Sequence, residues 1–168
     1  MSKIAIVYYT ISGNTEYVAE HIAEKIDADL IKIVPKKEYP NSGFKKFFWG
    51  GKSAVMGETP ALEEYQFDEN KYDYIVFGSP VWASSFVPPI RTFIKENRDK
   101  LNNKKIAVFI TYSGGGAEKA IEKLKKYLEI DNFEAQLILI DPKEKESEEN
   151  MNKIVEFCNK IKNNNTVQ

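Results

Sequence analysis

The stretch KIAIVYYTISGNTEYVAEHIAEK, residues 3–25, changes character in its middle. Residues 3–9 form a nearly continuous apolar run, which is typical of a β-strand that is buried on both faces of a sheet. From about Asn14 to Asp27 the apolar residues recur at helical spacing. A strand that passes directly into a helix predicts a βα unit, with the hexapeptide TISGNT (residues 10–15) at the junction.

The same alternation of strand and helix continues along the chain. Further strands are expected at residues 29–34, 73–78, 104–111 and 135–140, and helices from about Pro88, after the glycines that end at Gly116, and at residues 147–162. Because the strands read as hydrophobic on both faces, we predict an α/β/α sandwich around a five-stranded parallel sheet. Its expected order is 2-1-3-4-5, with strands numbered along the chain.

The length of 168 residues favours one domain, which we expect to span residues 1–163, followed by a polar tail at 164–168. Residues 35–72 are long for a connection between two strands. Part of this segment, GFKKFFWGGKSAVMGETP, could form a short helix with Lys45, Lys46 and Lys52 facing water.

Composition excludes several classes of protein. The net charge is −1, and neither half of the chain has the basic excess that nucleic-acid binding requires. No apolar run approaches the ~20 residues that span a bilayer, so we expect a cytoplasmic protein without a membrane partner. The single cysteine, Cys158, lies in a helical stretch and is interpreted as a core residue. We assign no metal site and no catalytic residue.

The hexapeptide at the first junction has the composition of an anion site. A helix N-terminus presents unpaired N–H groups and a partial positive charge, which favour a phosphate. Gly13 permits a close backbone approach, and Thr10, Ser12, Asn14 and Thr15 add polar side chains, with no lysine among them. The alternative is an ordinary helix start that is capped by Ser12 or Asn14 and binds no ligand.

Two later loops also follow predicted strands. GSPVWASSFVPP, residues 78–89, offers the indole of Trp82 for stacking on a flat ring, although Trp82 could instead cover the core. TYSGGGAEKA, residues 111–120, places three glycines where a backbone could lie against such a ring, although it could instead be a flexible turn that caps the next helix. The carboxyl ends of parallel strands meet at one edge, so we expect the three loops to converge there.

TISGNT, between an apolar strand and a helix, resembles the phosphate loop of flavodoxins, and the resemblance extends over essentially the whole chain in a short-chain, flavodoxin-like form. It implies FMN as the cofactor, with its 5′-phosphate in the first loop and its isoalloxazine ring against the other two. The implied cofactor-binding residues are Thr10, Ile11, Ser12, Gly13, Asn14, Thr15, Pro80, Val81, Trp82, Ala83, Thr111, Tyr112, Ser113, Gly114, Gly115 and Gly116.

The resemblance leaves three functions open. The first, which we favour, is an electron carrier that docks transiently with redox partner proteins. The second is an NAD(P)H-dependent FMN oxidoreductase that acts on quinones, and the third is a scaffold that has lost its cofactor. Many flavodoxins have a glycine after the ring-stacking aromatic residue, whose peptide flips to stabilise the one-electron-reduced flavin. Ala83, Ser84 and Ser85 stand there instead, which predicts weak stabilisation of that form.

Overall fold

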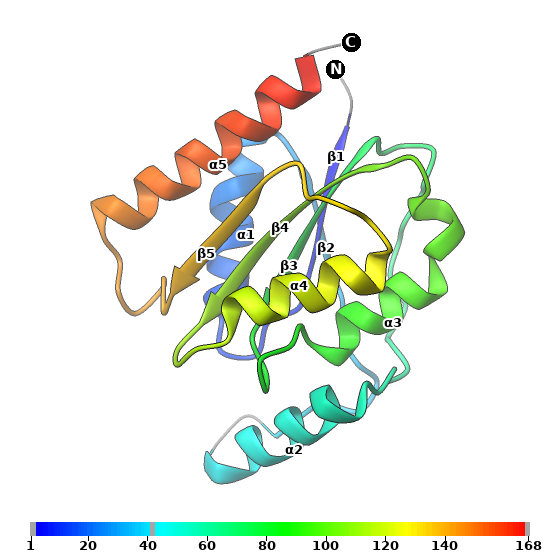
Figure 1. Ribbon diagram of the computed structural model, residues 1–168, viewed down its shortest axis with the longest axis vertical. Coiled ribbons are helices and arrows are strands. Elements are labelled where there is room, and N and C mark those ends of the chain that lie inside the picture. The colour runs from blue at the N-terminus through cyan, green and yellow to red at the C-terminus, as the bar shows by residue number, and fades with distance from the viewer. Residues whose placement is uncertain (1–2, 41–42, 167–168) are drawn as a thin grey trace.

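The computed structural model describes residues 3–40 and 43–166, with only the backbone described for residues 43–49 and 166. Its centre is a parallel sheet in the order β2-β1-β3-β4-β5 (Figure 1), so the order expected from the sequence is confirmed. The strands are β1 (Ile4–Tyr8), β2 (Asp29–Lys32), β3 (Tyr74–Pro80), β4 (Lys105–Tyr112) and β5 (Gln136–Ile140).

Two pairs of helices cover the two faces of the sheet. α1 (Asn14–Ile26) and α5 (Glu148–Thr166) pack on one face, where Ile22 of α1 and Phe157 of α5 share a buried cluster with alternate strand residues. α3 (Pro88–Glu96) and α4 (Ala117–Leu128) pack on the other face through residues such as Phe93 and Leu124. A short 3₁₀ helix, Arg98–Leu101, follows α3. The burial of apolar surface on both faces explains why β1, β3 and β4 consist mostly of apolar residues.

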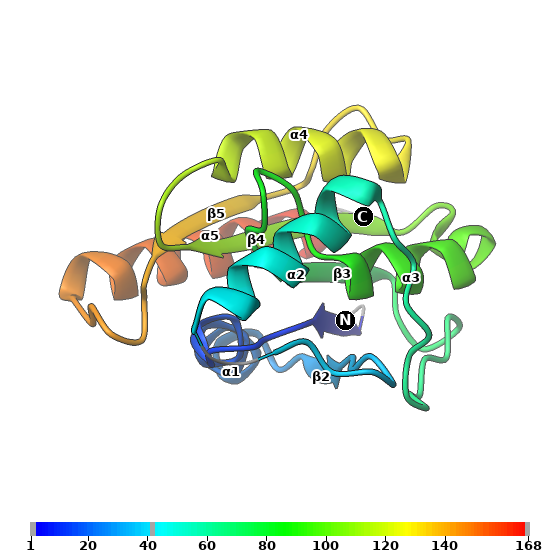
Figure 2. The ribbon, with the colours of Figure 1, turned by 90° about the horizontal axis from the view of Figure 1, so that it is seen from below.

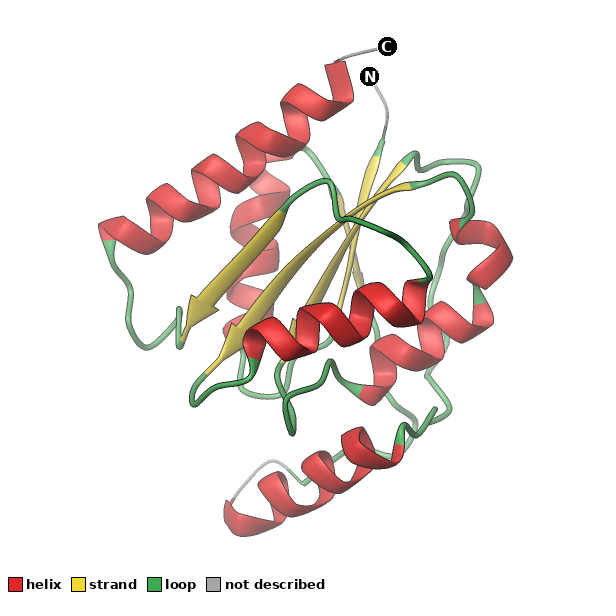
Figure 3. Cartoon of the chain, in the orientation of Figure 1, coloured by secondary structure: helices red, strands yellow, loops and turns green. Residues whose placement is uncertain are grey.

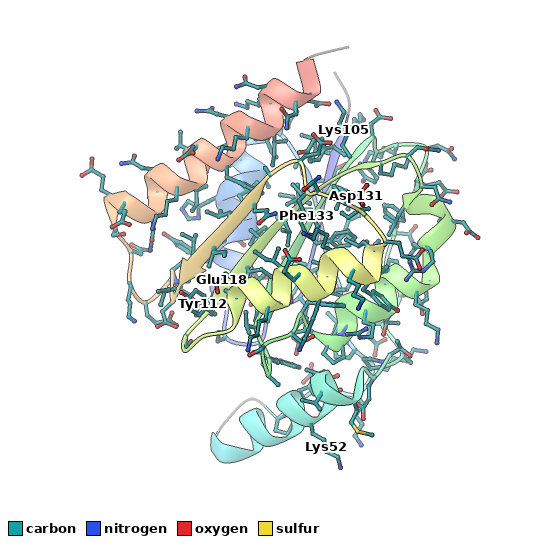
Figure 4. The ribbon with its side chains drawn as sticks, viewed as in Figure 1. Lys52, Lys105, Tyr112, Glu118, Asp131 and Phe133 are labelled. Atoms are coloured by element: carbon teal, nitrogen blue, oxygen red, sulfur yellow. The ribbon has the colours of Figure 1, made fainter. Side chains whose placement is uncertain are left out.

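The long connection between β2 and β3 contains the predicted short helix, α2 (Gly43–Met56). It lies outside the two helical layers, below the sheet in Figure 1, and it crosses in front of the sheet when that end is viewed directly in Figure 2. Lys52 is exposed and points away from the sheet (Figure 4), as expected. The side chains of Lys45 and Lys46 lie outside the described residues.

The C-terminal helix is longer than expected. A polar tail was predicted from residue 164, but α5 continues to Thr166. Asn164 explains the extension, because its side-chain amide donates to the backbone oxygen of Glu134 at 3.2 Å and its own backbone oxygen accepts a hydrogen bond from Lys105. Contacts to distant segments therefore hold a turn that local composition does not favour.

Cys158 lies in the core as the sequence predicted. It is 2 % exposed, and burial raises the pKa of its thiol to about 11, which keeps it protonated and unreactive. Among the described residues, none of the helices combines the length and apolarity needed to cross a bilayer.

Candidate functional site

The connecting loops after β1, β3 and β4 gather at the carboxyl ends of the central strands (Figure 3). A cleft opens among these loops. The register of the sheet brings these ends together, since Tyr8 lies opposite Gly78 and Pro80 lies opposite Thr111. Residues of all three predicted loops line the cleft: Ile11, Ser12, Asn14, Pro80, Val81, Trp82, Ala83, Thr111, Tyr112, Ser113, Gly114 and Gly115. Of the predicted residues, Thr10, Gly13, Thr15 and Gly116 do not line it, and the sequence missed Gly51 of α2, which does.

The first loop leaves the start of α1 open. The cap position is occupied by Gly13, with φ 93°, and none of the side chains that the structure describes accepts a hydrogen bond from the first turn. The alternative of a helix capped by Ser12 or Asn14 is therefore wrong. The amide of Asn14 instead donates to Ser12 Oγ at 3.3 Å and accepts from the backbone N–H of Lys143 at 2.9 Å. First-turn N–H groups without a side-chain cap suit an anion.

Two threonines of the first loop, Thr10 and Thr15, form hydrogen bonds within the protein and do not line the cleft. Thr10 Oγ1 accepts a hydrogen bond from the backbone N–H of Gly13 at 3.1 Å. Thr15 is 1 % exposed, and its hydroxyl lies 2.8 Å from the hydroxyl of Thr111 in β4. These hydroxyls hold the loop in place, which leaves Ser12 as the exposed hydroxyl of the first loop.

The second loop turns sharply around Trp82. Trp82 and Ser85 exchange two backbone hydrogen bonds of 3.0 Å, and the intervening Ala83 and Ser84 have φ values of 49° and 55°. Both are positive, a conformation that costs residues with a Cβ atom about 1–2 kcal/mol each. If the peptide after Ala83 flipped, as it can where a glycine stands, Ala83 would adopt a backbone conformation that only glycine occupies readily.

The indole of Trp82 covers part of the core and also lines the cleft. Its ring meets those of Tyr9 and Tyr39 edge-on, at centroid distances of 5.7 Å and 4.9 Å. A Cβ atom on Gly50 would lie 3.1 Å from Trp82 Cε3, so the backbone of α2 lies directly against the indole. Trp82 is half-buried over the core and also lines the cleft. The neighbouring rings hold it in one orientation.

The third loop has glycines of two kinds. Gly114 and Gly115 are exposed, and a Cβ atom on either would meet no atom of the described residues within 4 Å. Gly116 is different: its φ is 88°, and a Cβ atom there would lie 2.9 Å from the Cα atom of Ser84. Gly116 therefore allows the second and third loops to touch. Tyr112 lies beside this loop at the end of β4, and Glu118 lies at the start of α4 (Figure 4).

A fourth loop, residues 141–147 between β5 and α5, was missed by the sequence analysis. Asp141 accepts hydrogen bonds from Ser113 Oγ at 2.5 Å and from Lys145 Nζ at 2.8 Å, and these donors, Lys145 first, lower the pKa of Asp141. The backbone N–H of Lys143 meets Asn14. The fourth loop therefore ties the third loop to the first. Its sequence, DPKEKES, has no glycine or aromatic residue to mark it as part of a site.

The comparisons with known proteins agree with this geometry. A family model described as "Flavodoxin" matches residues 3–157. A flavoprotein from Lactobacillus acidophilus NCFM, whose crystal structure is a complex with FMN, is similar with 25 % identity and a TM-score of 0.71, over 86 % of this chain and 96 % of that one.

Two flavodoxins from Bacillus cereus share the fold. Oxidised Flavodoxin 1 has 18 % identity and a TM-score of 0.58, over 96 % of this chain and 98 % of that one. Oxidised Flavodoxin 2 has 21 % identity and the same TM-score, over 97 % and 99 %. Because the family model spans nearly the whole chain and the strand order is that of the fold, this chain belongs to the flavodoxin family.

Proposed function

We propose that this protein binds FMN in the cleft and carries electrons between partner proteins. The observation that carries the proposal is the convergence of three different surfaces on one cleft: an uncapped helix start, an oriented indole and an open glycine backbone. A phosphate and a flat, largely apolar ring need these surfaces side by side. Membership of the flavodoxin family supports the same cofactor.

Different residues of the cleft would contact different parts of FMN. Ser12 and the first-turn N–H groups of α1 would hold the phosphate, with Thr10 and Thr15 keeping the loop in shape. Trp82 would lie against the isoalloxazine ring, and the backbone at Gly114 and Gly115 would lie along the ring's edge. Bound FMN supplies one- and two-electron chemistry, and the protein positions the ring and limits its contact with water.

Electron transfer needs a partner to approach the rim of the cleft, so we propose transient complexes with redox partner proteins. A cytoplasmic location remains part of this proposal. The runner-up function, an NAD(P)H-dependent FMN oxidoreductase, requires a nicotinamide to lie over the flavin.

Steady-state assays separate the two functions. The FMN-loaded protein is mixed with NADPH or NADH and a quinone, and then with a flavodoxin reductase and cytochrome c as acceptor. The proposal predicts negligible turnover of nicotinamide by the protein alone and rapid cytochrome reduction when the reductase is added. Rapid NAD(P)H oxidation by the protein alone would contradict the carrier function and support the enzyme.

A further inference from the structure

The TISGNT loop, residues 10–15, contains no lysine or arginine, but a lysine from another loop lies beside it. Lys143, in the loop between β5 and α5, lies against Gly13: a Cβ atom on that glycine would be 3.0 Å from Lys143 Nζ and 3.6 Å from its Cδ. The ammonium group therefore lies at the N-terminus of α1, although 129 residues separate Lys143 from Asn14.

The backbone around Lys143 is fixed independently of its side chain. Its N–H donates to Asn14 Oδ1, and the preceding Pro142 is buried. Asp141 holds the start of the loop through its backbone N–H, which donates to the oxygen of Tyr112 at 3.0 Å, and through its carboxylate contact with Ser113. The loop therefore presents the Lys143 side chain beside Gly13, at the start of α1.

Two nearby lysines already have carboxylate partners, whereas Lys143 has none among the residues that the structure describes. Lys32 pairs with Glu16 at 2.8 Å, and Lys145 pairs with Asp141 at 2.8 Å. Within the described part of the chain, no carboxylate oxygen lies within 4 Å of Lys143 Nζ, and the Lys143 side chain is exposed. Glu16 is the nearby carboxylate that feels its charge, but Lys32 and the hydroxyl of Tyr8 already bind Glu16. The ammonium group is available to another anion.

We infer that Lys143 is a binding residue for the phosphate of FMN, so that the cation missing from the TISGNT loop comes from the far end of the chain. The inference rests on the proposed function. A lysine is a mobile point charge on a flexible stem, well suited to closing over an anion that enters beside it. An ammonium–phosphate contact is charge-assisted and weakens as salt is added.

The test compares FMN with riboflavin, which lacks the phosphate. Dissociation constants are measured by flavin fluorescence at low salt and at about 0.5 M NaCl, for the wild type, Lys143→Met, Lys143→Arg and Lys143→Glu. Lys143→Met keeps the backbone contact to Asn14 and removes only the charge. Lys123→Met, at an exposed position on α4, is the matched control.

At low salt we expect Lys143→Met to raise the dissociation constant for FMN about tenfold and Lys143→Glu to raise it further. The constant of Lys143→Arg should stay within about threefold of the wild type, because arginine keeps the charge. These sizes are those of a charge-assisted contact at an exposed site. The affinity for riboflavin should change less than about twofold in all three Lys143 variants. In the control Lys123→Met, the affinities for FMN and for riboflavin should both change less than about twofold. The effect of Lys143→Met on FMN affinity should shrink at high salt.

Unchanged FMN affinity in Lys143→Met would overturn the inference while leaving FMN binding intact. Equal losses for FMN and riboflavin would also overturn it, because they would show that the side chain supports the cleft by packing. A wild-type protein that binds neither flavin would overturn the proposed function itself, and this inference with it.

Discussion

At the scale of single residues, the three adjacent glycines of the third loop differ in backbone conformation and in the space around them. Gly114 and Gly115 face open space at the cleft, whereas Gly116 has a positive φ and lies against the backbone of Ser84. Sequence alone treats the run GGG as one feature. The structure separates two positions that are free to serve a ligand from one that the fold requires.

Gly115→Ala and Gly116→Ala therefore form a matched pair. Gly115→Ala should leave the free energy of unfolding of the apoprotein within about 0.5 kcal/mol of the wild type, because no atom opposes the methyl group. The same methyl group should weaken flavin binding by crowding the ring. Gly116→Ala should cost about 2 kcal/mol or more through positive φ and overlap with Ser84. Urea unfolding and flavin titration measure both effects, and equal stability of the two variants would contradict this assignment.

The turn after Trp82 is another feature of single residues. Ala83 and Ser84 occupy the left-handed region although each carries a Cβ atom. Tight turns of this kind usually have glycine at the position that Ala83 occupies here. Strain of this sort is often found where a ligand is bound.

Ala83→Gly should relieve that strain. We expect the apoprotein to gain about 0.5–1 kcal/mol in urea unfolding, since the left-handed penalty exceeds the entropy that glycine loses on folding. The peptide after Ala83 would also become free to flip. Stepwise reduction of the FMN-loaded variant should then show more one-electron-reduced flavin than the wild type. A less stable variant with an unchanged reduction spectrum would contradict both points.

At the scale of elements, the site depends on contacts between loops and the elements behind them. The buried hydroxyl pair of Thr15 and Thr111 joins the first turn of α1 to the end of β4. Thr15 was predicted to bind the phosphate, and that remains a prediction; its buried hydroxyl lies against Thr111, and Thr15 does not line the cleft.

A double-mutant cycle tests that contact. Thr15→Val alone and Thr111→Val alone should each lower the free energy of unfolding by about 1–2 kcal/mol, because each leaves a buried hydroxyl without its partner. The double variant should cost less than the sum of the single variants. Urea unfolding of the apoprotein checks the cycle, and strict additivity would show that the two hydroxyls do not interact.

Sequence patterns predicted most of the fold and three of the four loops, for reasons that are visible in the elements. Continuous apolar runs mark the buried strands, and glycines and Trp82 mark the loops after β1, β3 and β4. Lys143 and Gly51 could not be predicted, because their places depend on how distant segments pack. The same is true of the last turn of α5, which Asn164 holds through Glu134 and Lys105.

At the scale of the whole molecule, helices pack on both faces of the sheet, and the carboxyl ends of its central strands form the floor of the cleft. The loops tie to one another across that floor, through Ser113 and Asp141 and through Asn14 and Lys143. A ligand that contacts all of these loops should therefore stabilise the entire fold, since it binds the folded state alone.

Thermal unfolding measures this linkage. With FMN at about one hundred times its dissociation constant, mass action adds about 2.7 kcal/mol, which should raise the Tm by about 5–10 °C for a chain of this size. Riboflavin at the same concentration should raise the Tm less, because it lacks the phosphate. A Tm that does not respond to FMN would contradict this coupling.

The most direct test of the central claim is a titration of the wild-type apoprotein with FMN and with riboflavin, followed by flavin fluorescence. Phosphate binding at the start of α1 and stacking on Trp82 together predict quenching that saturates at one FMN per chain, with riboflavin bound at least about tenfold more weakly. Equal affinities for the two flavins, or FMN fluorescence that the protein leaves unchanged, would contradict the account.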